Sequence, residues 1–492
     1  MTFKIVVVGG GTAGIMASTY LKAFWGSKVD VISVYDHKTP GIGVGESLTP
    51  SFDEYLKYTG VSTIDLIKNC GAAIKLGLKF VDWVPGKSWV HTFVQNELLQ
   101  FVDETHMHYN SIDAYDIATG VYDNAYGYGY HYFENNYLPS PDNLSYRHAL
   151  HVDATKVSKY IEGRFKDHIE TIDGVVVDCD VVGDTIQNIV LADGRRITAD
   201  LFIDATGLAR LLMSKLTNTW NSMGDILPTN RTIPNPLFAD FDNIPPYTTA
   251  NATEDGWILD VPLQNRHGTG YVYSSNFTTD EQAKERFDHW LKNKYGVGLQ
   301  SDRVIKFESG HWSKHWVGNC IALGLAGGFV EPLEATNIHH TFAQLRHLTT
   351  LHPLNDTVSH SRNLYNTTVH GLYNNAFRYV RYFYSTGRRD SEFWRYMDDN
   401  TPEWLVDLKQ TAASSFLSTQ HIEQGHMFEA RNFIVIGHGH GFFSPESAEA
   451  YLKNKFLWDH ARVASERIRR VKSMPNTQRV NHRQWINSVL NS

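Results

Sequence analysis

The stretch that decides the fold is FKIVVVGGGTAG, residues 3–14. It starts with six largely apolar residues, as expected of a strand buried on both faces, and glycines follow at once. We expect Gly9 to permit a tight turn, Gly11 to let a pyrophosphate approach the backbone, and Gly14 to allow close helix–strand packing. The ten residues after Gly14 predict a helix, and residues 28–35 a second strand. This order indicates a dinucleotide-binding unit with phosphates at the helix N-terminus.

The acidic residue that binds ribose hydroxyls in such units is displaced by one position. It is expected at the end of the second strand, where Tyr35 stands, and Asp36 follows. We predict that Asp36 performs this role from a shifted register. The alternative, which the sequence leaves open, is that Asp36 is a solvated turn residue.

Two more segments end in glycine-rich turns. The first of them is preceded by residues 175–199, which predict an antiparallel meander with a hairpin turn at Asp193-Gly194. An apolar strand then ends at Asp204, Thr206 and Gly207, and the segment CIALGLAGGF, residues 320–329, repeats the pattern. Each turn alone fits an ordinary α/β sheet. Together with the N-terminal motif they favour one sheet that presents its C-terminal ends to a long ligand, and so a flavin.

Composition bounds the remaining choices. The 492 residues can bury a large core, and a net charge of -8 argues against a nucleic-acid partner. The three cysteines have no metal-ligand spacing, so we predict neither a disulfide framework nor a metal site. No apolar run is long enough for a signal peptide or a membrane span. We expect a cytoplasmic protein without a membrane partner, and the sequence leaves self-association open.

One lysine stands in an otherwise apolar segment. Lys75 lies within AAIKLGL, residues 72–78. An interior lysine has its charge disfavoured and its amine made more nucleophilic, which suits capture of a small electrophilic oxidant. The alternative is a lysine at a strand end that reaches solvent, which is the common fate of lysines.

A carboxylate lies in a second apolar segment far downstream. Glu334 stands between Val330 and Ile338. The alternative to a functional role is that it is an ordinary acidic residue at the N-terminus of a helix. Thr336 then offers a hydroxyl and Asn337 a backbone N–H, which together form a small polar nest suited to an anion. We therefore predict an anion site at Thr336 and Asn337.

These motifs resemble the flavin-dependent halogenases of the tryptophan-halogenase type. The resemblance covers most of the first 340 residues and rests on the N-terminal glycines and on the segments IGVGES (42–47), IKLGLKF (74–80), DGW (255–257), YVYSS (271–275) and EPLE (331–334). It implies an α/β, flavin-monooxygenase-like FAD-binding box (Rossmann-type, GxGxxG) over residues 1–345. It also implies a mostly α-helical C-terminal module over residues 346–492, packed on that box.

The resemblance also implies the chemistry. FADH2 from a separate flavin reductase, O2 and a halide ion give a hypohalous acid, which reaches a distant chamber for an electron-rich aromatic small molecule. There Lys75 holds the halogen and Glu334 positions it or accepts a proton. The halide residues implied are Thr336 and Asn337, and the substrate contacts implied are His91, Phe93 and Trp257. The cofactor contacts implied are Gly9, Gly11, Thr12, Ala13, Gly14, Asp36, Val44, Gly45, Glu46, Asp204, Gly207, Leu325 and Ile338.

The chain departs from the family pattern at two places. Ala335-Thr336-Asn337 replaces the Ser-Thr-Gly that follows the glutamate, and Leu259 replaces the second tryptophan of Gly-Trp-x-Trp-x-Ile-Pro. Fewer well-placed donors penalise chloride most, because chloride loses the strongest hydration. We therefore predict bromide or iodide over chloride, and an open aromatic substrate range because leucine is smaller than tryptophan.

Two other functions remain from the sequence alone. Leu259 encourages a flavin-dependent aromatic monooxygenase or hydroxylase, and the altered halide segment also fits a non-catalytic flavoprotein. Past residue 345, Tyr373, Phe377, Val380 and Tyr384 recur at helical spacing, which predicts packing rather than a pocket. The basic stretch RIRRVK, residues 467–472, predicts a solvated helix end.

Overall fold

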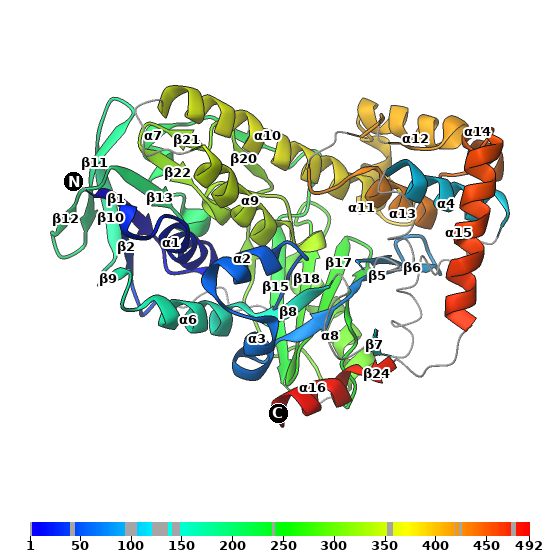
Figure 1. Ribbon diagram of the computed structural model, residues 1–492, viewed down its shortest axis with the longest axis horizontal. Coiled ribbons are helices and arrows are strands. Elements are labelled where there is room, and N and C mark those ends of the chain that lie inside the picture. Colours follow the sequence, from blue (N-terminus) through cyan, green and yellow to red (C-terminus); the bar gives the residue numbers. More distant parts are fainter. Residues whose placement is uncertain are drawn as a thin grey trace. The chain divides into compact units, whose positions relative to one another are not determined.

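The computed structural model describes residues 2–39, 45–93, 106–120, 136–139, 148–238, 242–351, 358–418, 420–422, 426–473 and 479–492. The residues, which Figure 1 draws coloured by their position in the sequence, group into two compact units. The first comprises Met1–Ala72, Val152–Pro228 and Phe307–Asn374, and the second Ala73–His151, Thr229–Lys306 and Asn375–Ser492. The chain therefore passes between the units several times. The module boundary expected at residues 345 and 346 stays a prediction.

The first unit is built on a six-stranded sheet. Its order is β21 (Trp316–Val317), β22 (Cys320–Ala322), β13 (Leu201–Asp204), β1 (Phe3–Val8), β2 (Val29–Tyr35) and β9 (Glu170–Asp173). All pairings are parallel except that between β21 and β22. The predicted strands at residues 3–8, 28–35, 200–204 and 320–324 therefore lie side by side, as the apolar runs indicated.

Helix α1 (Thr12–Trp25) follows β1 directly, beginning three residues earlier than the sequence predicted. Gly9 has φ of +123°, and a Cβ on it would lie 2.3 Å from the carbonyl oxygen of Ala205. A Cβ on Gly14 would lie 1.8 Å from the carbonyl oxygen of Gly9. These two close approaches confirm the tight turn and the close helix–strand packing predicted for Gly9 and Gly14.

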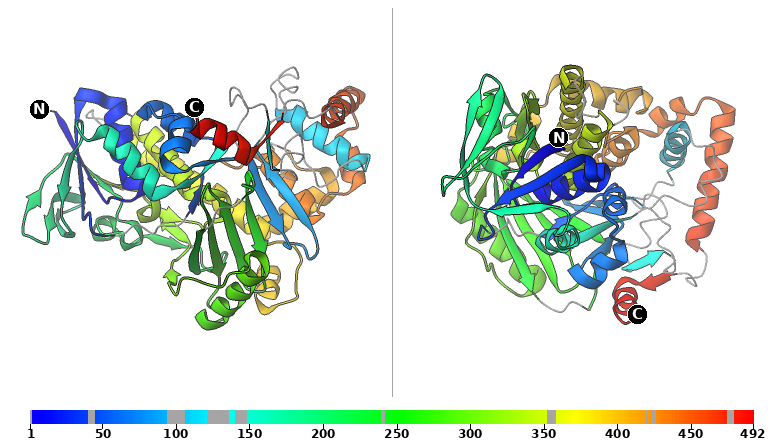
Figure 2. Two further views of the ribbon diagram at one scale, coloured as in Figure 1. Left: turned by 90° about the horizontal axis from the view of Figure 1, so that it is seen from below. Right: turned by 60° about the vertical axis from the view of Figure 1, so that its left-hand side comes forward.

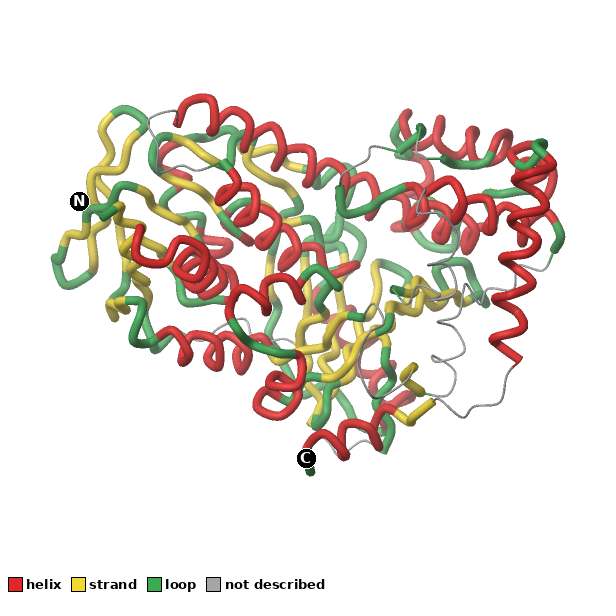
Figure 3. Tube along the Cα trace, viewed as in Figure 1, coloured by secondary structure: helices red, strands yellow, loops and turns green. Residues whose placement is uncertain are grey.

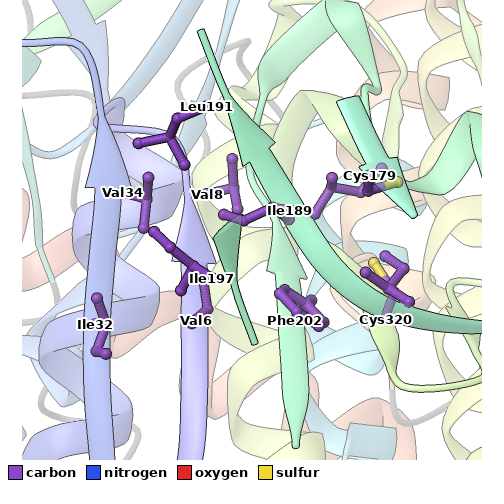
Figure 4. Close-up of a cluster of buried hydrophobic side chains, with 12 residues drawn as sticks. Val6, Val8, Ile32, Val34, Cys179, Ile189, Leu191, Ile197, Phe202 and Cys320 are labelled. Carbon is purple, nitrogen blue, oxygen red and sulfur yellow. The ribbon is translucent and has the colours of Figure 1, made fainter. Parts of the chain in front are cut away.

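The core of this unit is formed between the sheet and the predicted meander. The meander consists of the antiparallel strands β10 (Val176–Val182), β11 (Thr185–Leu191) and β12 (Arg196–Ile197). Its apolar side chains pack against those of the parallel strands (Figure 4), and the cluster includes Val6, Val8, Ile32, Val34, Cys179, Ile189, Leu191, Ile197, Phe202 and Cys320. Burial of this apolar surface is what fixes the meander in place.

Helices and short strands complete the first unit. Helix α1 contacts α2 (Phe52–Thr59), α6 (Ala154–Phe165) and α9 (Thr336–Thr350), while α3 (Thr63–Cys70) contacts α6. A three-stranded sheet has the order β14 (Trp220–Ser222), β20 (Gly310–Trp312) and β23 (Gly328–Phe329). The remaining elements are β3 (Gly45–Ser47), α7 (Met213–Leu216) and the 3₁₀ helices η1 (Gly26–Lys28), η3 (Gly207–Ala209), η4 (Gly324–Ala326) and η5 (Leu333–Ala335).

The second unit contains a seven-stranded sheet. Its order is β19 (Ile305–Lys306), β15 (Arg231–Phe238), β18 (Arg266–Tyr273), β17 (Gly256–Pro262), β16 (Tyr247–Ala252), β5 (Gly77–Val81) and β6 (Ser88–Thr92). Helix α8 (Asp280–Tyr295) packs against this sheet (Figure 2), with Phe287 and Leu291 in the same buried cluster as Ile258. A short strand, β4 (Ala73–Lys75), pairs with β8 (Ala149–Asp153).

The C-terminal part of the chain is mostly helical (Figure 3). Long helix α10 (Val358–Phe383) is followed by α11 (Glu392–Asp399), α12 (Glu403–Ser415), α13 (Ala430–His440), α14 (Pro445–Tyr451) and α15 (Lys455–Ser473). Helix α4 (His106–Ala118) packs with α14 and α15. Strand β24 (Arg479–Asn481) pairs with β7 (Tyr137–Pro139) and leads into α16 (His482–Leu490). The predicted helical C-terminal module is confirmed.

The helical stripe predicted beyond residue 345 is buried. Tyr373, Phe377, Val380 and Tyr384 are all buried, so the helical stripe is a packing surface, as predicted. Among the helices of the described ranges, none is long and apolar enough to cross a membrane. The side chains of the basic stretch at 467–472 lie outside the described residues.

Candidate active site

Three glycine-containing turns meet at the C-terminal ends of the parallel strands. The turn after β1 leads into α1, the turn after β13 into η3 and that after β22 into η4, and η3 contacts η4. A Cβ on Gly324, at the start of η4, would lie 2.6 Å from the Cβ of Ala13 in α1. The segments that hold the predicted cofactor residues of these turns thus lie together at one edge of the sheet. These residues are Gly9, Gly11, Thr12, Ala13, Gly14, Gly207 and Leu325.

The start of α1 has the features that a bound pyrophosphate needs. The N-cap residue Gly11 makes no side-chain capping hydrogen bond, and the first turn of the helix contains no acidic residue. A Cβ added to Gly11 would meet no atom within 4 Å, so the space beside this backbone is open. The N–H groups of the first turn of a helix have no partner inside the helix and favour an anion. The residues present therefore fit the phosphates of FAD.

Asp36 lies just beyond the end of β2, half-buried and engaged in its own turn. Its carboxylate accepts hydrogen bonds from the N–H of Lys38 at 2.9 Å and from Oγ1 of Thr39 at 2.8 Å. These bonds hold its pKa below the usual range. The hydroxyl of the preceding Tyr35 donates to a carboxylate oxygen of Glu162 on α6. This geometry matches the turn-residue alternative, and a ribose contact by Asp36 stays a prediction.

Asp204 ends strand β13 and is fully buried. Its carboxylate accepts from the N–H and the hydroxyl of Thr206 at 3.1 and 2.6 Å, and from the N–H groups of Leu212 and Met213 at 2.9 and 2.8 Å. Burial raises its pKa, and these hydrogen bonds oppose the shift. Because four donors of its own loop occupy the carboxylate, Asp204 shapes the turn that contains Gly207. A direct contact with the cofactor stays a prediction.

The segment at residues 42–47 is described only in part. Val44 lies outside the described residues, whereas Gly45 and Glu46 belong to β3, whose backbone contacts η5. Because η5 contains Glu334, the predicted cofactor segment and the predicted catalytic glutamate are neighbours within the first unit. No spacing pattern in the sequence predicts that these two segments are neighbours.

Glu334 lies in a strained loop. Its backbone has φ of +64° and that of Ala335 has φ of +55°, so two consecutive non-glycine residues adopt the left-handed region. Such residues cost free energy and are concentrated at functional sites. The Glu334 side chain is 2% exposed. The surrounding fold therefore holds a buried carboxylate in a conformation that the local sequence does not favour.

The strained loop leads directly into α9, whose first turn holds the predicted halide residues. The N-cap residue Ala335 has no side chain able to cap the helix. Thr336 and Ile338 are buried. In the part of the chain that the structure describes, neither Oγ1 of Thr336 nor Oδ1 of Asn337 has a hydrogen-bond partner. Buried polar atoms in a native protein are nearly always paired, so this helix start is arranged for a polar ligand or water.

Lys75 lies at the end of β4 in the second unit. Its side chain is 0% exposed, so the solvent-reaching alternative is wrong and the interior position is confirmed. Its Nζ lies 4.8 Å from the centroid of the Phe93 ring. Nearby His151 is fully buried, and its pKa is well below the usual range because of burial and, second, the charge of Lys75. The predicted catalytic lysine thus lies beside Phe93, a predicted substrate contact.

His91 is oriented by a residue that the sequence analysis missed. The N–H of Glu429 donates to Oδ1 of Asn432 at 2.8 Å, so Nδ2 of Asn432 donates to Nε2 of His91 at 3.0 Å. Nε2 therefore carries the lone pair. The His91 and Phe93 ring centroids are 6.1 Å apart. Asn432 is a helix-capping residue separated from His91 by 341 positions, and its local sequence signals only the cap.

Trp257 lies on β17 and is fully buried. Ile258 belongs to the cluster that packs with α8, so Trp257 and Leu259 share the opposite face of the sheet. Within the described residues, the indole Nε1 of Trp257 has no hydrogen-bond partner. The leucine noted in the sequence is thus on the same face as the remaining tryptophan, and a substrate contact by Trp257 stays a prediction.

Solved structures of similar proteins define the fold class of this chain. The tryptophan C-6 flavin-dependent halogenase (chlorinase) from taromycin biosynthesis superimposes with a TM-score of 0.90 at 26% identity, covering 100% of both chains. A flavin-dependent halogenase from Xanthomonas campestris shares the fold, with a TM-score of 0.87 at 24% identity over 99% of this chain and 98% of the other. The fold is therefore that of an FAD-binding, Rossmann-type enzyme with a helical C-terminal region.

Sequence relatives then give the family. The chain is 30% identical over 424 residues to the 7-chloro-L-tryptophan 6-halogenase KtzR of Kutzneria sp. (strain 744), covering 80% of this chain and 81% of that one. It is 29% identical to the tryptophan 7-halogenase RebH of Lentzea aerocolonigenes, covering 80% and 78%. The tryptophan halogenase family model matches residues 4–454. The chain belongs to this family of flavin-dependent halogenases, which are oxidoreductases, so the predicted resemblance is confirmed.

Proposed function

We propose that the chain uses FADH2, O2 and a halide to halogenate an electron-rich aromatic small molecule through hypohalous acid and Lys75. One observation carries the proposal: a lysine that is 0% exposed lies with its Nζ 4.8 Å from the centroid of the Phe93 ring. A buried lysine needs a reason, because burial of an ammonium group is costly. Handling an electrophilic halogen beside an aromatic substrate is such a reason.

The chain would hold FAD at the gathered turns. Backbone N–H groups at the start of α1 would bind the pyrophosphate, and the open space beside Gly11 would admit it. When bound, reduced FAD with O2 supplies the two-electron oxidation that turns a halide and a proton into hypohalous acid and water. Asp204 would act by fixing the adjoining turn through its four hydrogen bonds.

The halide would bind at the start of α9. The unpaired hydroxyl of Thr336 can rotate to donate to an anion, and the helix N-terminus adds N–H groups and a favourable dipole. The amide of Asn337 can turn so that Nδ2 takes the place of the unpaired Oδ1 and becomes a third donor. The left-handed residues Glu334 and Ala335 set the direction in which the helix start points.

Lys75 and Glu334 would carry out the substitution. Lys75 binds the halogen of hypohalous acid and directs it to a ring carbon. A carbon–halogen bond forms as the oxygen–halogen bond breaks, and the oxygen leaves as water after gaining a proton. Glu334 accepts the proton that the substituted carbon releases, or positions the hypohalous acid. One ring hydrogen is thus exchanged for one halogen.

The aromatic substrate would lie against the ring of Phe93, with His91 and Trp257 as further contacts. Asn432 donates to Nε2 of His91, which fixes the orientation of the His91 ring beside Phe93. Leu259 shares the sheet face of Trp257 and occupies less space than the tryptophan of relatives. We therefore propose a substrate range broader than free tryptophan.

The supply of reductant and the halide preference complete the proposal. The chain has no second G-x-G-x-x-G motif after a strand, so a separate flavin reductase would supply FADH2. The altered segment at Ala335–Asn337 favours bromide or iodide over chloride. A cytoplasmic setting is in keeping with three cysteines that are free and buried.

Product analysis tests this function. Chemically reduced FAD, O2 and a phenol or indole are supplied to the purified chain with and without bromide. We expect a brominated product only when bromide is present, and no turnover when NADH or NADPH replaces reduced FAD. A hydroxylated product in both samples would establish a monooxygenase instead. Peroxide release without any modified aromatic would establish a flavoprotein that does not act on the substrate.

A further inference from the structure

The C-terminal segment of the chain lies beyond the family match, which ends at residue 454. Strand β24 pairs antiparallel with β7, and α16 follows with its N-terminus capped by Asn481, which accepts from the N–H of Gln484 at 3.2 Å. The segment is thus an ordered part of the second unit. Its first helical residue, His482, is fully buried.

His482 joins three backbone segments by hydrogen bonds. Its own N–H donates to the carbonyl oxygen of Asn136 at 2.8 Å, and its ring nitrogen Nδ1 lies 2.9 Å from the carbonyl oxygen of Ile244. Its Nε2 accepts from the N–H of Ile74 at 3.1 Å. Because both backbone partners have fixed roles, Nδ1 carries the proton and Nε2 the lone pair. Burial lowers the pKa of His482 to about 4, which keeps the ring neutral.

The hydrogen bond between Ile74 and His482 lies on the edge of β4 that does not pair with β8. One edge of this strand pairs with β8, with Lys75 opposite Ala149. On the other edge, the N–H of Ile74 is bonded to His482, and the N–H of Leu76 donates to the carbonyl oxygen of Pro246 at 2.7 Å. The two peptide N–H groups that flank Lys75 are therefore both fixed, one by a backbone carbonyl and one by an imidazole.

We propose that His482 is a positioning residue for Lys75: its Nε2 supplies the acceptor that the edge of β4 lacks. The inference rests on the proposed function of Lys75. Without this acceptor, the buried N–H of Ile74 would lose its partner, and the strand would shift to find another. A misplacement of about 1 Å can cost about 10²-fold in rate when the reacting groups must be aligned.

The geometry predicts which substitutions are tolerated. In His482→Gln, Oε1 reaches the place of Nε2 and still accepts from Ile74. In His482→Asn, the side chain is shorter and its oxygen reaches only the place of Nδ1. Both replacements are polar and uncharged. His482→Gln keeps the acceptor for the Ile74 N–H, whereas His482→Asn can keep a donor for the Ile244 carbonyl and leaves the Ile74 N–H without its acceptor. Ser488→Ala is the matched control, because Ser488 bonds within α16, to the carbonyl oxygen of Trp485.

The experiment measures brominated product per reduced FAD oxidised, together with hypobromous acid escaping to an added scavenger. We expect His482→Gln and the Ser488→Ala control to stay near wild type. We expect His482→Asn to lower halogenation about tenfold, with flavin oxidation unchanged and more hypobromous acid escaping. Misplacing Lys75 would produce this uncoupling.

Several results would overturn the proposal. They are equal activity in the Asn and Gln variants, equal loss in both, and loss of flavin oxidation in step with halogenation. The last two would make His482 a folding residue. Lys75→Ala in the same assay separates this inference from the proposed function. If Lys75→Ala still halogenates, the role of Lys75 fails; if it does not and the Asn variant remains coupled, only the role of His482 fails.

Discussion

Asp204 and the start of α9 are two buried polar regions of the same unit that differ in how their polar atoms are used. The carboxylate of Asp204 accepts four hydrogen bonds from its own loop. By contrast, Thr336 Oγ1 and Asn337 Oδ1 have no partner among the described residues. A saturated buried group holds the fold together, whereas an unsaturated one is available to a ligand. The comparison separates a residue that shapes the site from residues that would bind at it.

The largest effect is expected at Lys75. Replacement by alanine should lower halogenation by about 10³-fold or more, because the amine that directs the halogen is lost. Flavin binding and hypohalous acid formation should be retained, since they belong to other residues. Product analysis at equal flavin turnover measures this, with Lys79→Ala, on β5, the next strand along the chain, as the control. Substantial activity in Lys75→Ala would make the lysine structural.

The next effect is expected at Glu334. Glu334→Gln keeps the shape of the side chain but removes the charge that accepts a proton or orients the hypohalous acid. We expect turnover to fall about 10²-fold or more. The rate should be measured with reduced FAD in excess, so that flavin supply does not limit it. An unchanged rate would remove Glu334 from the mechanism.

Asp204→Asn tests the region whose buried carboxylate already accepts four hydrogen bonds from its own loop. The amide NH2 cannot accept from the loop N–H groups that the lost oxygen served, so buried donors are left unpaired. We expect the free energy of unfolding to fall by about 2 kcal/mol. Denaturant unfolding measures this, and Asp36→Asn is the control, because Asp36 is only half-buried and its hydrogen bonds to described residues lie within its own turn. Equal stability of the two variants would contradict the structural role of Asp204.

A smaller effect concerns the choice of halide. With equimolar bromide, iodide and chloride and one phenol or indole substrate, we expect brominated or iodinated product to exceed chlorinated product. Chloride loses the most hydration on binding and gains least from a site with few donors. A mainly chlorinated product would show that Asn337 restores the donors that the serine and glycine of relatives provide.

The local part of the fold could be predicted from the sequence. An apolar run followed by glycines has one physical solution at Gly9 and Gly14, where any Cβ would meet a backbone oxygen closer than 2.5 Å. Lys75 could also be predicted as an interior residue, because its segment is apolar and carries the family motif. In each case the information lies within a few neighbouring residues.

The supporting residues could not be predicted, because their partners are far away in the chain. Asn432 and His91 are separated by 341 positions, and His482 and Ile74 by 408. No local pattern marks an imidazole that serves a strand edge. The family resemblance implied a cofactor contact for Asp204, and only the structure shows that donors of its own loop occupy its carboxylate.

The most direct test concerns the unpaired hydroxyl at the start of α9. Wild type and Thr336→Val are titrated with bromide while the midpoint of thermal unfolding is followed. A ligand that binds only the folded state raises this midpoint as its concentration rises above Kd. We predict that bromide stabilises the wild type and not Thr336→Val, and that the variant without bromide is as stable as wild type, because the lost hydroxyl had no partner. Equal stabilisation of both proteins by bromide would contradict a halide site at Thr336.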